Sequence, residues 1–315
     1  MEAGERMKIL YNGADLIAFG QKPQEALTID RAGGEADSLS VIFPDPKGTW
    51  ASWGAARGDT ARLISGTLDT GVMWVDNPSE SSGAFRFDAT SIHPNARLQR
   101  ARIWRDIKLS EIISDVAGHA RLTPSIQNGV IDWSYKAISQ NMETDLAFLV
   151  RICAREGYAV KATGGQLVVY DEQQLESVTP SVTLTPQDVS PEYGFEDGTG
   201  LLSAATVVYY NVQKRLLIKQ TVTDVNTVGG TIQRTEMVSD DGEAQRFAWG
   251  ALRMANKWRR VGVFTLNQMT NLAAGSTVAL SGFPGSDNGA WFVYQTVYDA
   301  MQDKMRVYVR RPLAY

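Results

Sequence analysis

The hydrophobic period of the chain changes twice along its length, and this limits the folds that it can adopt. Between residues 8 and 91, short runs of alternating apolar and polar residues, such as Ser38–Phe43 and Ala84–Ala89, are separated by turn residues such as Asn12-Gly13. A period of two is typical of half-buried antiparallel strands. The period becomes helical between about residues 100 and 175, and strand-like segments return after residue 200. The sequence therefore predicts an α+β, β-rich protein, with a barrel or sandwich in its first part.

Strands are predicted at both ends of the chain. In the first part they are Met7–Tyr11, Ala26–Asp30, Ser38–Phe43, Thr60–Ile64, Val72–Val75 and Ala84–Thr90. In the last part they are Ala205–Tyr210, Leu216–Val222, Thr231–Met237, Gly262–Leu266, Ser276–Ser281, Ala290–Val297 and Arg306–Arg310. One long helix, from about Gly242 to Arg259, interrupts the second set behind the capping residues Asp240 and Asp241.

Two amphipathic helices are predicted in the middle. The first runs from Lys108 to Arg121, and the second runs from about Glu143 to Glu156, with Thr144 as its N-cap. The apolar positions that predict them are Leu109, Ile112, Ile113, Val116 and Ala120 in the first, and Leu146, Leu149, Val150 and Cys153 in the second. Cys153 is accordingly expected in the core.

A hairpin and a proline-rich connector complete the middle part. The hairpin pairs Tyr158–Ala162 with Gln166–Tyr170, and the connector carries Pro180, Pro186 and Pro191. We predict three domains at residues 1–98, 99–177 and 178–315, the first and last rich in strands and the middle one small and α+β.

Composition excludes several classes of protein. Of 315 residues, 43% are hydrophobic and 21% charged, which is typical of a folded chain. A single cysteine allows no internal disulfide, and no Cys/His cluster predicts a metal site. No run of about 18 apolar residues occurs, so we expect a soluble protein made in a cytoplasm, without membrane binding. The net charge of −4 argues against stable nucleic-acid binding.

Catalytic motifs are not found. The histidines are His93, before Pro94, and His119, late on a helix, and neither lies in a nucleophile motif. The acid pairs Glu111/Asp115, Glu143/Asp145 and Asp240/Asp241 are expected on solvated helix faces or at helix N-termini. The glycine pairs fit no phosphate-binding frame, so we predict neither a cofactor nor catalytic residues.

Surface and interface candidates come from the basic and aromatic residues. The segment Lys257-Trp258-Arg259-Arg260 is explained by the helix dipole without an anionic partner. Eight tryptophans are many for this length, and tryptophan favours cores and interfaces alike. We select Trp50, Trp53, Trp291 and Val293 as candidate subunit or partner interface residues, Trp50 and Trp53 because they lie in a Gly/Ala-rich loop.

The order of these segments resembles the phage late control D family, the baseplate hub proteins of contractile phage tails and tailocins. The residues from Asn141 to Gly157 are similar to the family's N-x-x-S/T-D-L-x-F-L-x-R-L-A-x-x-x-G helix. Trp104 to Ile113 resembles its W-x-D-x-T-L-x-D-I-V helix, with Lys108 where the family has threonine. Gly275 to Phe283 and Asn288 to Val293 are similar to its closing strands, with Tyr298 near the place of a usual histidine.

The resemblance implies a fold and a role. Both β-rich parts would be tail-tube-like antiparallel β-barrel domains, and three subunits would present six of them to a six-fold tail tube. The chain would form a homotrimer in the tail baseplate or tailocin particle, assembled in the host cytoplasm. Its partners would be the spike trimer and the tube protein, with tape-measure and wedge proteins as further candidates. Because type VI secretion spike proteins continue beyond this fold, the spike is expected to be a separate chain.

Two alternatives remain open. The first is a tail-associated cell-wall hydrolase, although no carboxylate pair here lies in a recognisable cleft motif. The second is a glycan-binding baseplate accessory protein, which would expose Trp50 or Trp53 in a shallow polar groove.

Overall fold

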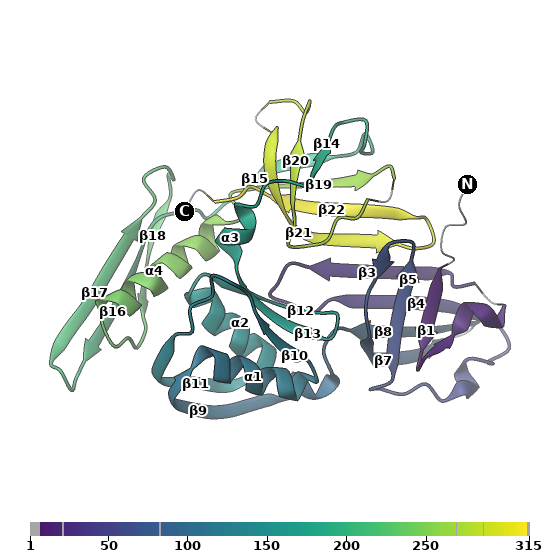
Figure 1. The fold of residues 1–315 in the computed structure, drawn as a ribbon, viewed down its shortest axis with the longest axis horizontal. Helices are drawn as coiled ribbons and strands as arrows, with labels where there is room; N and C mark the ends of the chain where they lie inside the picture. The colour runs from purple at the N-terminus through teal and green to yellow at the C-terminus, as the bar shows by residue number, and fades with distance from the viewer. Residues whose placement is uncertain (1–6, 21, 82, 269, 286, 314–315) are drawn as a thin grey trace.

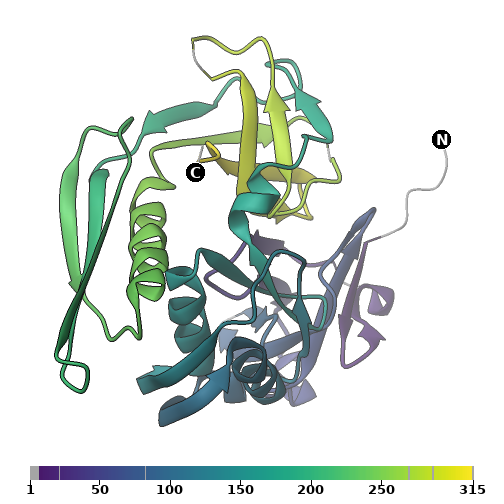
Figure 2. The ribbon, with the colours of Figure 1, turned by 60° about the vertical axis from the view of Figure 1, so that its left-hand side comes forward.

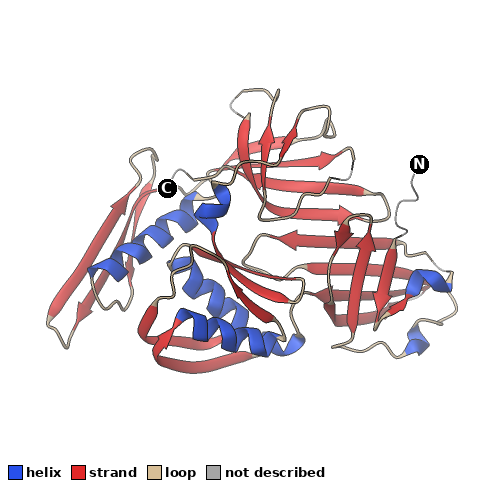
Figure 3. Ribbon diagram, in the orientation of Figure 1, coloured by secondary structure: helices blue, strands red, loops and turns tan. Residues whose placement is uncertain are grey.

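The protein is built around one large sheet to which two smaller units are attached (Figure 1). The computed structural model describes residues 7–20, 22–81, 83–268, 270–285 and 287–313. Strands predominate over helices throughout (Figure 3), as the alternating pattern predicts. The β-rich α+β class is thereby confirmed.

The large sheet combines strands from both ends of the chain. Strand β3 pairs with β4 on one side and with β21 on the other, with Ile29 opposite Val297. Among the described residues the strand order runs from β15 to β2 without returning on itself. Its strands are β1 (Lys8–Tyr11), β2 (Ala14–Asp15), β3 (Glu25–Arg31), β4 (Ser38–Asp45), β5 (Thr60–Ser65), β6 (Leu68–Asp69), β7 (Met73–Ser81), β8 (Gly83–Thr90), β14 (Val182–Leu184), β15 (Gly194–Asp197), β19 (Arg260–Leu266), β20 (Thr277–Leu280), β21 (Gly289–Asp299) and β22 (Lys304–Arg310).

One hydrophobic core lies under this sheet. In β4 every second residue is buried, beginning with Leu39, Val41 and Phe43. The alternating sequence pattern therefore predicts correctly that one face of this strand is buried. The short 3-10 helices η1 (Leu16–Phe19) and η2 (Ala51–Trp53) border it, whereas Ala96 of η3 (Pro94–Arg97) lies in the core of the middle unit.

The middle of the chain forms a second core around two helices, α1 (Leu109–Ala120) and α2 (Asp145–Arg155). The five predicted apolar residues of α1 are all buried. In α2, Leu149 and Cys153 are buried as predicted, but Phe148 and Ile152 complete the buried face, and Leu146 and Val150 are only partly covered. The hairpin is present as β12 (Tyr158–Thr163) and β13 (Gln166–Asp171).

Three strands of this unit were not predicted. Strand β10 (Thr123–Ile126) pairs parallel with β13, and β9 (Gln99–Lys108) pairs with β11 (Ser134–Thr144) as a two-stranded ribbon. Apart from the buried Tyr135, Ile138 and Gln140 of β11, the ribbon is only partly covered, so its alternation is weak. Trp104 to Lys108 therefore belong to β9, and the helix begins at Leu109.

The start of α1 is capped by one carboxylate from outside the helix and one from its first turn. With Lys108 at the N-cap, the backbone N–H of Ser110 donates to Asp132 Oδ1 at 2.8 Å, and Lys108 N donates to Glu111 Oε2 at 2.9 Å. Helix α2 follows the prediction, since Ala147 N donates to Thr144 Oγ1 at 3.2 Å.

A third core lies between α4 (Asp241–Asn256) and a sheet of β16 (Leu202–Asn211), β17 (Leu216–Thr223) and β18 (Gly230–Thr235). Figure 2 shows α4 between this sheet and the α1–α2 unit. The apolar side of α4 is buried at Ala244, Phe247, Ala248 and Ala251, but Trp258 lies beyond the helix and is 40% exposed. The predicted connector contains a short helix, α3 (Glu172–Glu176), and then β14.

Candidate functional site

Two of the four interface candidates pack beside the N-terminal strands of the large sheet. Trp50 is buried, with its ring centroid 5.0 Å from that of Phe43. Trp53 is 40% exposed, and its ring centroid lies 4.6 Å from that of Tyr11. Of this pair, Trp53 is the one whose aromatic ring is exposed.

The other two candidates are fully buried in the subunit. Trp291 donates its Nε1 hydrogen to the backbone oxygen of Asp287 at 2.8 Å, and Val293 stands opposite Val309 in the sheet. Neither side chain is exposed, so a substitution at either position would affect assembly by disturbing the sheet. The interface role of all four residues stays a prediction.

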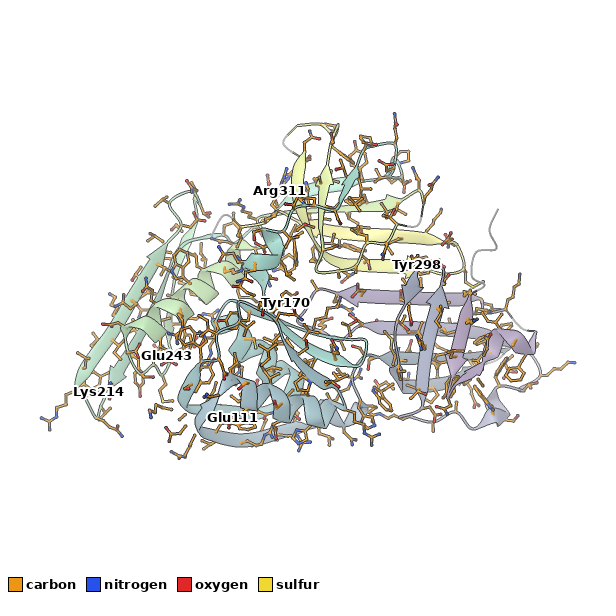
Figure 4. The ribbon with its side chains drawn as sticks, viewed as in Figure 1. Glu111, Tyr170, Lys214, Glu243, Tyr298 and Arg311 are labelled. Carbon is orange, nitrogen blue, oxygen red and sulfur yellow. The ribbon has the colours of Figure 1, made fainter. Side chains whose placement is uncertain are left out.

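Polar contacts fix the middle unit against the large sheet. Lys161 of β12 forms an ion pair with Asp30 of β3 and donates to Ala274 O at 3.0 Å. Tyr170, labelled near the centre of Figure 4, donates its hydroxyl hydrogen to Ala32 O. Beside them, burial and the nearby charge of Asp30 raise the pKa of Asp37 to about 7.

Helix α4 presents a second, polar stripe to its neighbours. The residues Arg246, Gly250, Arg253 and Lys257 follow one another at spacings of four, three and four, which places them on one side of the helix. Arg246 donates to the fully buried carboxylate of Glu156 at 2.9 Å and lies 3.6 Å from the ring centroid of Trp133. Burial raises the pKa of Glu156, and the attraction of Arg246 opposes that rise.

A buried cluster of charges joins α4 to α3 and β22. Arg253 Nη2 donates to Glu176 Oε1 at 2.6 Å, and Lys257 lies 3.5 Å from Glu172. Arg310 of β22 is fully buried and contacts Glu172 at 3.0 Å. Glu176 also accepts the backbone hydrogen of Leu313 at 3.0 Å. The helix-dipole explanation for Lys257 was incomplete, since its side chain is largely buried against a carboxylate.

Gly250 sets the distance between α4 and α2. A Cβ at this position would lie 2.3 Å from the backbone oxygen of Arg155. We expect Gly250→Ala to push the helices apart and to lower the free energy of unfolding by about 1–3 kcal/mol. Chemical denaturation measures the change.

Gly118→Ala is the matched control for that variant. Gly118 lies inside α1, and a Cβ added there would have no atom within 4 Å, so alanine should stabilise the protein by up to about 1 kcal/mol. Equal effects of the two variants would contradict the close approach at Gly250.

The buried thiol of Cys153 gives a test of the α2 packing. It is fully buried, as predicted, and burial raises its pKa far above the usual range. The thiol should react with a maleimide at least about a hundredfold more slowly in the native protein than in denaturant. Rapid native labelling, read by mass spectrometry, would contradict this packing.

Both histidines and the carboxylate of Asp145 contact other groups of the protein. His93 is buried, which lowers its pKa, and its Nδ1 accepts from Asn95 N at 3.2 Å. Asp145 is fully buried, not solvated as expected, because Arg100 and Arg102 bind its two oxygens at 3.0 and 2.8 Å. His119 Nδ1 lies 3.0 Å from the same carboxylate.

No three His, Cys, Asp or Glu side chains in the described ranges are grouped as metal ligands. No helix among those residues is long and apolar enough to span a membrane. A hollow of about 440 Å³ beside Gly250 is lined by Arg151, Arg155, Arg234, Glu236 and otherwise by apolar or small residues, without a histidine.

The comparisons with known proteins decide the family. The model of the phage tail baseplate hub (GPD) family matches residues 74–304. The chain belongs to this family. A probable baseplate hub protein of Escherichia phage 186 is 25% identical over 202 residues, covering 57% of this chain and 49% of that protein. The chain therefore spans about half the length of this curated relative.

Solved structures share the fold of this hub-family chain. A 43 kDa tail protein of prophage MuSo2 from Shewanella oneidensis has a TM-score of 0.73 at 14% identity, covering 98% of this chain and 99% of that one. A tail protein from Neisseria meningitidis MC58 has a TM-score of 0.75 at 12% identity, covering 96% and 95%. The E. coli c3393 protein, a type VI secretion component, has a TM-score of 0.58 at 12% identity, covering 98% and 77%. These tail and type VI secretion proteins share the fold of this chain.

Sequence reasoning missed the polar stripe of α4 and the carboxylates that it binds. A signal was present, since Arg246, Gly250, Arg253 and Lys257 share one helical face in the sequence. Glu172 and Glu176 are also four residues apart, but nothing in the sequence links them or Glu156 to α4, and only the packing of three units brings them to this face.

Proposed function

We propose that this protein is the structural hub of a contractile tail baseplate. It forms a homotrimeric ring that joins the six-fold tail tube to the trimeric membrane-piercing spike, and it nucleates tube assembly without catalysing a reaction. The observation that carries the proposal is the match of residues 74–304 to the baseplate hub family.

The two β-rich parts act in this proposal as tail-tube-like barrel domains that line the ring. Residues 1–98 and 178–315 form these domains, and residues 99–177 form the small α+β domain between them. The pairing of β3 with β21 supports a rigid wall, because the two parts then share backbone hydrogen bonds instead of a flexible joint.

In this proposal the ring binds other components of the tail. The tube and spike proteins bind opposite ends of the ring, and tape-measure and wedge proteins bind its margins within the virion or tailocin. The VgrG protein of Francisella has been solved in complex with PdpA, and its similar fold supports a hub that binds other components. The mild net negative charge suits a bore that lets DNA pass without holding it.

Light scattering of the purified protein, with and without its spike protein, tests the proposal. A trimer of about three times the 34.6 kDa subunit mass, alone or on mixing, is expected. A monomer that does not bind the spike protein and that clears a cell-wall suspension would overturn the hub proposal and favour the cell-wall hydrolase.

A further inference from the structure

The hairpin of β16 and β17 projects from the body as an arm. Helix α4 covers one face of its sheet, and Lys214 marks the far end of the hairpin (Figures 1 and 4). Thr206, Val208 and Tyr210 of β16 alternate with the buried Ala205 and Val207, so they lie on the opposite face. No described element packs on that face in the views of Figures 1 and 2.

The outer edge of the arm is an open strand. Among the described residues, β17 pairs with β16 alone, over eight consecutive positions without a register shift. Its sequence, Leu216–Thr223, contains no proline. Edge strands of soluble proteins are usually protected by proline, a bulge or charged side chains, because their N–H and C=O groups pair readily with another strand. The one charged residue of β17 is the exposed Lys219, so this edge repels a basic strand but can accept an acidic one.

Large apolar side chains surround the tip of the arm. Tyr210, Val212, Leu216 and Leu217 are exposed by 54%, 74%, 52% and 57%. They come from adjoining positions of the hairpin, with Tyr210 directly opposite Leu217. A cluster of this kind next to an open strand edge marks a surface that binds another protein.

The charge of the arm indicates what it binds. Residues 202–223 carry Lys214, Arg215 and Lys219 and no carboxylate, in a chain whose net charge is −4. A second open edge lies at β15, the end of the large sheet, and it is acidic: Glu192 and Glu196 are exposed there, beside Asp197, which is exposed and pairs with Arg260 at 3.1 Å. One chain therefore presents a basic, apolar strand edge and an acidic strand edge on different units.

We propose that the basic β17 edge of one copy pairs with the acidic β15 edge of a second copy. The inference deepens the proposed self-assembly and rests on it. Since the two surfaces differ, the contact is heterologous and repeats from copy to copy, which allows a closed ring. Charge attraction selects the partner edge, and the apolar tip adds buried area to the contact.

Reversing the charge of the arm tests this contact. Lys214→Glu with Lys219→Glu should weaken self-association, measured by light scattering against concentration, at least about tenfold. Arg215 is left unchanged because its φ of 49° is left-handed. Lys219→Glu alone, which leaves the bond from Lys214 Nζ to Ser239 O intact, should weaken it about threefold. The exposed cations Lys47 and Lys304, reversed together, are the control and should change it less than about twofold.

A charge swap identifies the acceptor edge. Adding Glu192→Lys and Glu196→Lys to the double arm variant should restore association to within about threefold of the wild type. Hydrogen exchange should be slowed at Leu216–Thr223 and Gly194–Asp197 on association. An unaffected oligomer, or a swap that restores nothing, would overturn this contact and leave the trimer proposal standing. A wild-type monomer at every concentration, with and without the spike, would overturn both.

Discussion

Replacing Val293 by aspartate is expected to prevent the protein from folding. Val293 is fully buried in β21, opposite Val309, and its N–H donates to Ser276 O at 2.9 Å. An isolated carboxylate at this place would lose its hydration without gaining a partner, at a cost of several kcal/mol. Domains are stable by only about 5–15 kcal/mol, so the soluble, assembled protein should disappear. Yield and light scattering measure the outcome.

Ala290→Asp is the matched control for that substitution. Ala290 lies on the same strand but is exposed, so its variant should retain the wild-type yield and mass. Val293→Ala, which removes two methyl groups without adding charge, should fold with a free energy of unfolding lowered by about 1–3 kcal/mol. A soluble Val293→Asp oligomer would show that this part of β21 is not a core strand.

The sequence predicts local structure well where one face of an element is buried by its own unit. The positions of α1, of the hairpin and of strands such as β4 follow from periodicity, because burial alternates along them. Strand β9 has no fully buried face, so its period is weak. The pairing of β3 with β21 could not be predicted, since strands more than 250 residues apart leave no local pattern that reports their register.

The family could be inferred from the segment around α2, whereas the contacts that hold the units together could not. Asp145 follows the N-cap Thr144 and reads as a solvated helix start, yet the arginines of β9 enclose it. Lys257 and Arg310 are likewise surrounded by carboxylates from a different segment. Which charged residues pair across long distances in the chain depends on how three separate cores pack together. The periodicity of any one segment does not predict that packing.

Arg310→Met should strongly destabilise the protein. The guanidinium of Arg310 is fully buried between Glu172 and Glu176, at 3.0 and 2.5 Å. Its loss leaves two buried carboxylates with fewer cations, and breaking a buried pair in this way costs about 3–5 kcal/mol. Chemical denaturation at pH 7 measures the free energy of unfolding. Arg306→Met, an exposed arginine of the same strand, should change it by less than about 1 kcal/mol.

The pH dependence separates lost charge pairing from lost packing in this variant. Burial by itself raises the pKa of Glu172, but the charges of Arg310, Lys257 and Arg253 outweigh it and lower the pKa to about 2. A depressed pKa means that the stabilisation is complete above the unfolded value, about 4.3, and is lost as the pH falls through about 2. Without Arg310 the pKa of Glu172 rises, so mild acid neutralises the uncompensated carboxylate. The stability difference between wild type and Arg310→Met should therefore shrink from pH 7 to pH 3, whereas a packing defect would leave it constant.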